Sequence, residues 1–146
     1  MKKYTFKVYP AGMGRRAYRV IEVPGTDTLD SLCSFILSSF DFIQEHLYEF
    51  NMDNKMYGSA LSYQCEPERG APSTRVSIDK LNLVKGQTFS LHYDFGDDWM
   101  FAIHVQKIEE ASGKVKRAVV SSKGKVEQYP DWDDEDEEEW DEDDEE

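Results

Sequence analysis

Three carboxylates stand within five residues of one another, at Asp94, Asp97 and Asp98. Carboxylates at this spacing can hold a hard cation or act as a general acid–base pair. The same residues suit a tight turn, because aspartate accepts hydrogen bonds from backbone amides and Gly96 can supply a positive φ. A calcium loop spreads about five oxygen ligands over twelve residues, and this segment lacks that spacing. The pattern therefore allows either a ligand-contacting role or a purely architectural turn.

His46 is the imidazole that we expect near these carboxylates. It stands at the start of a predicted strand that can lie beside Tyr93 and Trp99. Paired with Asp94 or Asp97, it can serve as a base or as a ligand-binding group. The alternative is a histidine that holds the end of its strand through a backbone hydrogen bond. The candidate ligand-contacting residues are thus His46, Tyr93, Asp94, Asp97 and Trp99, with no metal assigned and no cofactor predicted.

His92 and His104 alternate with apolar neighbours, so each faces the opposite side of its strand from Leu91, Tyr93 and Ile103. On that side the two histidines could be cross-strand neighbours. Two histidines supply only half of a zinc site, and both cysteines lie elsewhere in the sequence. We assign both histidines structural or surface roles.

These side chains need a sheet and a helix to position them. Residues 3–9 alternate apolar and polar side chains, and residues 17–23 are rich in β-branched and aromatic residues. Together they predict a hairpin across the segment PAGMGRR. Thr28 is a suitable N-cap for the clearest helix. Apolar residues then recur at three- and four-residue spacing, at positions 29, 32, 33, 36, 37 and 40. This stripe predicts one helix buried against a sheet.

Further strands are predicted where alternation returns. The elements that follow the helix are a strand at 46–52, a loop at about 58–73, a helical turn at 78–81, strands at 89–93 and 99–105 around a turn at 95–98, and a last strand at 115–121 after a turn at 111–114. Strands dominate around one main helix. This order predicts an α+β fold, a small roll or grasp-like mixed sheet with that helix packed on it.

Three segments resemble a known family. They are VPGTDTLDSL (23–32), QEHLYEF (44–50) and LHYDFGDDWMFAI (91–103), and they resemble the Ri-plasmid ORF-three-like family, whose members are often labelled transposon passenger or resolvase-like proteins. The string YDFGDDW is the specific part, and the resemblance runs from about residue 4 to residue 120. It implies a small α+β domain whose biochemical role is not established.

The resolvase label can be compared with the residues present. A serine recombinase needs an activated serine among arginines and a separate helix-turn-helix. A tyrosine recombinase needs a tyrosine nucleophile with an Arg-His-Arg set on a helical scaffold. We see neither pattern and reject recombinase activity for this chain alone. Family members commonly carry a histidine two residues after the motif tryptophan, but here Phe101 stands at that place after Trp99. A metal or acid–base role built on that histidine does not carry over.

Charge is distributed unevenly along the chain. The formal net charge is −13, yet residues 131–146 contain 14 acidic residues and no basic one. We predict a single α+β domain at 1–130 and an acidic disordered tail at 131–146. Basic residues form two clusters that could contact phosphates: Arg15, Arg16 and Arg19, and Lys114, Lys116 and Arg117 with Lys123 and Lys125. The tail either keeps the protein soluble or competes with phosphate at the second cluster.

Composition sets the remaining expectations. No stretch approaches the roughly 18 apolar residues that span a bilayer, and the first residues lack the apolar region of a signal peptide. Cys33 and Cys65 are the only cysteines, so we expect no disulfide framework and a cytoplasmic location. Our leading hypothesis is a non-enzymatic binding or interaction module of the resembled family, with an unknown protein or small ligand as partner and an undefined oligomeric state. The alternatives are a divalent-metal-dependent hydrolase or nuclease using His46 with Asp94 or Asp97, and a nucleic-acid accessory factor with a tail-masked basic surface.

Overall fold

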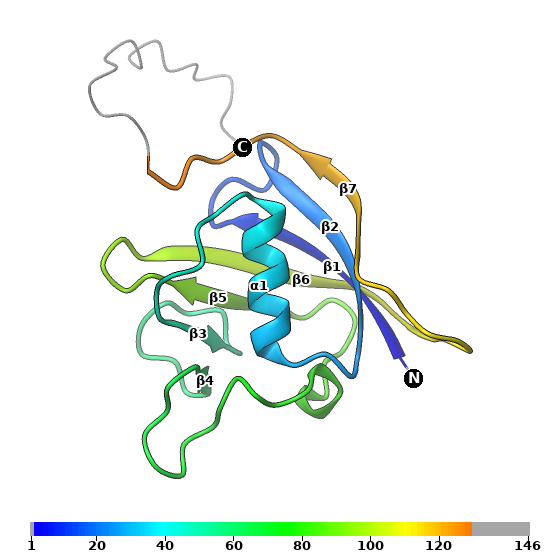
Figure 1. Ribbon diagram of the computed structural model, residues 1–146, viewed down its shortest axis with the longest axis horizontal. Helices are drawn as coiled ribbons and strands as arrows, with labels where there is room; N and C mark the ends of the chain where they lie inside the picture. The colour runs from blue at the N-terminus through cyan, green and yellow to red at the C-terminus, as the bar shows by residue number, and fades with distance from the viewer. Residues whose placement is uncertain (1, 130–146) are drawn as a thin grey trace.

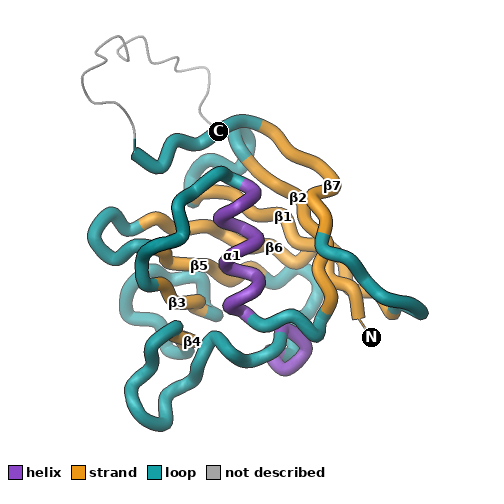
Figure 2. Tube along the Cα trace, viewed as in Figure 1, coloured by secondary structure: helices purple, strands orange, loops and turns teal. Residues whose placement is uncertain are grey.

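The computed structural model describes residues 2–129, which form one sheet and one α-helix (Figures 1 and 2). The elements in chain order are β1 (Lys2–Pro10), β2 (Tyr18–Pro24), α1 (Leu29–Ser39), β3 (Tyr48–Asn51), β4 (Ser62–Gln64), the 3-10 helix η1 (Ile78–Leu81), β5 (Thr88–Tyr93), β6 (Trp99–Glu110) and β7 (Ala118–Lys123). Across the sheet the strands are ordered β4-β3-β5-β6-β1-β2-β7. Helix α1 lies across one face of this sheet.

The sheet is antiparallel at each pairing of named strands. A parallel pairing occurs at an isolated bridge between Gln64 and Ser73. The predicted α+β class is confirmed, but the expected mixture of parallel and antiparallel strands is not found. Connectivity accounts for three of these pairings, β1–β2, β3–β4 and β5–β6, because a chain that reverses between neighbouring strands pairs them antiparallel. The helical crossover from β2 delivers β3 next to β5 instead of beside β2.

Helix α1 forms as its sequence pattern predicts. The hydroxyl of Thr28 accepts a hydrogen bond from the Ser31 amide at 3.1 Å, which satisfies one free donor of the first turn. The Asp30 carboxylate accepts from the Tyr48 hydroxyl at 2.6 Å and from the Thr74 hydroxyl. The buried stripe comprises Leu29, Leu32, Cys33, Ile36 and Leu37. The helix is therefore tied to β3 and to the segment before η1 as well as to the core.

The two faces of the sheet differ in chemistry. The face under α1 carries buried apolar side chains from five strands, among them Phe6, Ile21, Phe50, Leu91 and Phe101. The opposite face, called the outer face below, carries the alternate residues of the same strands. Its side chains are mostly polar or charged: Lys7, Glu22, Glu49, Asn51, Thr88, Ser90, His92 and His104.

Three local predictions need correction. The strand predicted at 115–121 begins three residues later, because β7 is Ala118–Lys123. The segment predicted as a loop at 58–73 contains the three-residue strand β4, which is too short to show alternation in the sequence. The strand predicted at 46–52 is shorter and begins at Tyr48, so His46 lies in the preceding connection. The predicted hairpin of β1 and β2 and the helical turn η1 are confirmed.

Candidate functional site

The turn between β5 and β6 is built by aspartates. The carboxylate oxygen Oδ1 of Asp94 accepts from the amides of Gly96 at 3.0 Å and Asp97 at 3.2 Å. The amide of Asp98 donates to the carbonyl of Asp94 at 2.6 Å. The turn chemistry predicted from the sequence is therefore present. The positive φ was expected at Gly96, but Asp94 and Asp98 adopt it, at 68° and 55°, since aspartate tolerates this region better than most residues.

His46 and Asp94 come together as the sequence predicted. The Nε2 atom of His46 lies 3.4 Å from Oδ2 of Asp94 and 2.9 Å from the hydroxyl of Tyr129. The His46 side chain is one-third exposed, whereas Asp94 is buried. Each oxygen of the Asp94 carboxylate thus faces a group of this chain, two amides on one side and an imidazole on the other. The arrangement is a histidine–carboxylate pair at the rim of the domain.

The predicted aromatic residues hold this rim in place. The Tyr93 hydroxyl accepts from the amides of Glu45 at 2.9 Å and His46 at 3.2 Å, and it donates to the carbonyl of Ile43. Burial raises the pKa of Tyr93. Trp99 packs edge-on against Phe42, with ring centroids 4.8 Å apart. Tyr93 and Trp99 therefore position the loop that carries His46, with Tyr93 buried and Trp99 half-buried.

Asp97 takes a different position from its neighbours. Its amide is bonded to Asp94, but its side chain is exposed at the tip of the turn. Within residues 2–129, the contacts of His46 with carboxylates are to Glu45 and Asp94. The predicted alternative pairing of His46 with Asp97 is therefore not found. Asp97 instead contributes negative charge to the surface of the turn.

A second histidine network, missed by the sequence analysis, lies on the outer face behind the same turn. His92 is 2% exposed. Its Nδ1 lies 3.0 Å from Glu49 Oε2, and its Nε2 lies 2.6 Å from Asp98 Oδ1. The hydroxyl of Tyr57 donates to the same Asp98 oxygen at 2.7 Å. Both carboxylates can be satisfied at once when both ring nitrogens carry protons.

This network also disproves one expectation about the histidines. His92 is paired with Met100 across the β5–β6 ladder, whereas His104 is paired with Thr88 four residues away. The two histidines share the outer face but are not cross-strand neighbours. Alternation along β5 and β6 correctly predicted that both histidines lie on the same face. The register of the β5–β6 pair could not be predicted from either strand alone. Of the structural and surface roles expected for His92, its burial leaves the structural one.

Electrostatics around Asp98 agree with the geometry. The Tyr57 hydroxyl and, next, His92 lower the pKa of Asp98. The hydrogen bond to Asp98 in turn raises the pKa of Tyr57. The rings of Tyr57 and Phe95 lie on His92, with centroids 5.4 Å and 4.9 Å away. The loop after β3 is thereby fixed over the outer face by a charged hydrogen bond and ring contacts.

The basic residues do not gather on one surface. Strand β7 pairs with β2 so that Lys123 lies opposite Tyr18 and Ala118 opposite Glu22. Lys123 therefore lies beside the start of β2, which follows the turn that holds Arg15 and Arg16. Residues 114–117 come directly before β7 and so lie near the other end of β2. The predicted second cluster is split between the two ends of this ladder. Its tail partner, residues 131–146, lies outside the described residues.

Arg19 is a correction to the predicted basic surface, because it is a buried side chain. Its Nε donates to the carbonyl of Ser39 at 2.7 Å, and its Nη1 donates to the carbonyls of Tyr18 and Lys123. The guanidinium lies over the Phe40 ring, 4.3 Å from its centroid. Burial lowers the pKa of Arg19. This arginine joins β2, β7 and the end of α1.

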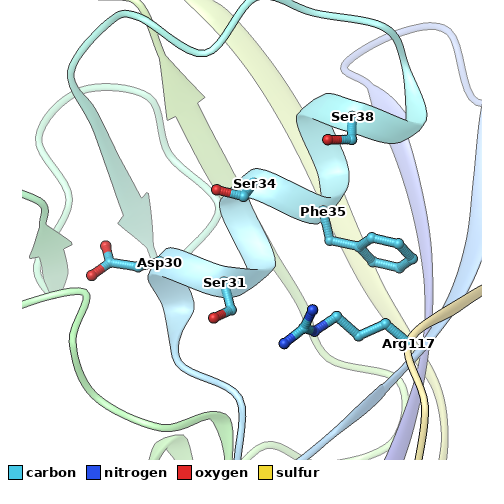
Figure 3. A pocket seen from close by; sticks show the side chains of 6 residues that line it. All are labelled: Asp30, Ser31, Ser34, Phe35, Ser38 and Arg117. Carbon is cyan, nitrogen blue, oxygen red and sulfur yellow. The ribbon is translucent and has the colours of Figure 1, made fainter.

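Arg117 is held in an ion pair near the start of α1. Its Nε lies 2.6 Å from Asp27 Oδ2, which raises the pKa of the guanidinium. It borders a hollow of about 340 Å³ along the exposed side of the helix, lined by Asp30, Ser31, Ser34, Phe35, Ser38 and Arg117 (Figure 3). On its other side Arg117 borders a hollow of about 430 Å³ with Lys114 and Lys116. These basic residues thus lie near the first turn of α1 and are remote from the β5–β6 turn.

Within residues 2–129, no group of three or more histidines, cysteines, aspartates and glutamates is arranged to hold a metal ion. In the same residues, no helix has the length and apolar character required to cross a membrane.

Comparisons with known proteins identify the family. The model of the plasmid pRiA4b ORF-3-like protein family matches residues 2–140, so the chain belongs to this family. The chain is also similar to a protein of unknown function from Methanosarcina mazei Go1, MM3350, whose crystal structure is known. The two are 25% identical with a TM-score of 0.68, over 83% of this chain and 69% of that one. No curated protein matches the chain. The family is one of unknown function, and the resemblance predicted from YDFGDDW is confirmed.

Proposed function

We propose that this protein is a non-catalytic interaction module that binds a basic, partly apolar segment of a partner protein at the β5–β6 turn. The proposed contact area, called the turn surface below, consists of Ile43, Leu47, Phe95, Asp97 and Tyr129. Phe95 forms its outer-face edge, because the Phe95 ring also packs on His92. The single observation that carries the proposal is the exposure of four large apolar side chains around one acidic turn. Ile43, Leu47, Phe95 and Tyr129 are 52%, 48%, 44% and 51% exposed.

Hydrogen bonds tie Ile43, Leu47 and Tyr129 to the turn or to its neighbours. The carbonyl of Leu47 accepts from the Asp94 amide at 2.9 Å, and the connection from α1 to β3 passes near the β5–β6 turn (Figure 1). Ile43 is held by the Tyr93 hydroxyl and by the side chain of Gln128, and Tyr129 by His46. A surface already fixed in place loses little conformational entropy when a partner binds.

Charge determines the kind of partner that we propose. Asp97 and Glu45 are exposed carboxylates within the apolar group, and the pKa of Asp98 behind them is lowered by Tyr57 and then by His92. Clustered apolar side chains are typical of contact sites, and a charge of one sign selects a partner of the opposite sign. A segment with lysine or arginine beside apolar residues fits both features.

The contacts of Asp94 support binding over the acid–base alternative. One carboxylate oxygen accepts two amides of the turn, and the other faces His46, whose Nε2 is shared with Tyr129. A general base needs a free acceptor within reach of a substrate proton. The pair is instead occupied in fixing the loop. We infer a reducing compartment such as the cytoplasm, since Cys33 and Cys65 are both free thiols.

The test is selection of peptides by the full-length chain from a random display library. We expect enrichment of peptides that combine basic and apolar residues, and loss of binding by at least about tenfold for Leu47→Ser or Phe95→Ser. Asp97→Asn should weaken binding less and reduce its salt dependence. Val84→Ser is the matched control, because Val84 is 61% exposed but precedes the opposite end of β5.

Two results would contradict the proposal. One is enrichment that Val84→Ser abolishes as strongly as Leu47→Ser. The other is self-association of the free chain that disappears with Leu47→Ser, which would assign the turn surface to a second copy of the protein. Sedimentation of the wild type and of both variants separates these results from loss of folding.

A further inference from the structure

A basic hollow lies on the outer face, away from the turn surface. It has a volume of about 440 Å³ and is lined by Lys7, Tyr9, Gly12, Gly14, Arg15 and His104. Two of the lining side chains are cations and a third is an imidazole, and no carboxylate lines the hollow. Its size lies within the range of small-molecule sites.

The sheet register brings the strand residues of this hollow together. Lys7 on β1 is directly opposite His104 on β6, and both point to the outer face. The Nδ1 atom of His104 is bonded to the Thr88 hydroxyl at 2.9 Å, which fixes the ring. The Nε2 atom has no bond to any described residue, so it can serve a ligand.

Aromatic rings hold the Lys7 ammonium in position. Its Nζ atom lies 4.6 Å from the centroid of the Tyr18 ring and 5.6 Å from that of Tyr9. A cation over aromatic rings is stabilised without losing its capacity to donate hydrogen bonds to an anion. Lys3, four residues earlier on the same face, is instead neutralised by Glu22 and Glu109 at 3.6 Å and 3.5 Å.

Two glycines shape the wall formed by the β1–β2 turn. Gly12 adopts a φ of +83°, which side-chain-bearing residues rarely adopt. Gly14 lies against Tyr9, and a Cβ atom added there would meet the ring at 3.3 Å. The turn can therefore approach the ring closely, and Arg15 follows at once beside the hollow.

We propose that this hollow is a binding site for the phosphate group of a small phosphate ester. Lys7 and Arg15 supply positive charge, and His104 supplies a directed nitrogen. A phosphate ester matches this set because its oxygens accept several charge-assisted hydrogen bonds. A volume of about 440 Å³ exceeds the space that a phosphate ion occupies, so the hollow has room for the organic group of an ester. The inference is independent of the turn surface.

The test is a titration of the full-length, isotope-labelled chain with a nucleoside monophosphate at about 0.15 M ionic strength. We expect resonance shifts at residues 7, 12–15 and 104, with weaker binding of inorganic phosphate and no saturation by the free nucleoside. Lys7→Met keeps the length of the side chain and should weaken binding about tenfold. Arg15→Gln is a second variant in an exposed turn, where loss of folding is not expected.

Lys116→Met is the matched control, because Lys116 is an exposed lysine before the far end of the β2–β7 ladder. It should leave the affinity within about twofold of the wild type, since charges beyond a Debye length are screened. The proposal is wrong if Lys116→Met weakens binding as much as Lys7→Met. It is also wrong if the free nucleoside binds as tightly as the monophosphate, or if the shifts occur elsewhere.

Discussion

The two sides of the β5–β6 turn each carry a histidine beside an aspartate, but in different surroundings. On the α1 side, His46 is one-third exposed and shares one nitrogen between Asp94 and Tyr129. On the outer face, His92 is buried and has a carboxylate at each nitrogen, Glu49 and Asp98. The same pair of residue types therefore stands once at the rim, near exposed apolar side chains, and once within a closed network.

The difference teaches that proximity of histidine and carboxylate does not by itself mark a functional site. Every polar atom of His92 is satisfied by this chain, so this network stabilises the turn and the loop over it. At His46 the hydrogen bonds fix a loop whose own side chains remain exposed. We therefore assign a supporting role to the His92 network and the binding role to the turn surface.

The largest effect should come from His92→Ala. It leaves Glu49, whose side chain is 15% exposed, without its histidine partner, and removing one partner of a largely buried network in this way costs about 3 kcal/mol of unfolding free energy. His46→Ala should cost only about 0.5 kcal/mol, because its partners keep contact with water or with backbone amides. Urea unfolding of both variants measures the difference. Equal costs would remove the distinction between the two sides.

A smaller effect is expected from changes at Asp94. Asp94→Ala removes the acceptor for the amides of Gly96 and Asp97 and places alanine at a φ of 68°, which should cost about 2 kcal/mol. Asp94→Asn keeps a side-chain carbonyl and tolerates this φ, so it should cost less than half as much. Thermal unfolding compares them. If asparagine is as damaging as alanine, the charge facing His46 matters more than the turn.

The smallest effect concerns acid. Tyr57 and then His92 lower the pKa of Asp98 in the folded state. A carboxylate with a lowered folded pKa contributes stability above its unfolded value of about 3.9, and this stability is lost as the pH falls through the folded value. Asp98→Asn should therefore flatten the loss of stability below about pH 5.

Asp53→Asn provides a reference for this measurement. The Ala60 amide and the Ser59 hydroxyl lower the pKa of Asp53 within the same loop. Asp53→Asn should therefore remove the acid-dependent stability that Asp53 contributes and leave the contribution of Asp98 in place. Unfolding free energies at several pH values give the slopes. A slope for Asp98→Asn equal to that of the wild type would show that His92 and Tyr57 do not stabilise the ionised form.

Much of the fold could be predicted because local periodicity records it. Thr28 and the apolar stripe define α1, and alternation defines the strands around both hairpins. Strand β4 could not be found, since three residues, Ser62–Gln64, show no period. The antiparallel order across the sheet depends on long-range pairing of β1 with β6, for which neither strand carries a local signal.

The candidate site was predictable in part. His46 and Asp94 belong to the motif segments, and their convergence follows once β3 and β5 are neighbours. The burial of His92 was not predictable, because the Tyr57 ring that packs on it belongs to a loop without periodicity. Arg19 shows the same limit: its sequence neighbours suggest a surface cluster, while its partners, Ser39 and Lys123, lie far along the chain.

Chemical-shift mapping of a selected basic, apolar peptide on the labelled full-length chain tests the central claim most directly. Our account predicts saturable shifts at residues 43–47, 94–97 and 129, retained in His46→Ala and lost in Leu47→Ser. Shifts centred on another surface, or shifts that persist unchanged in Leu47→Ser, would contradict it.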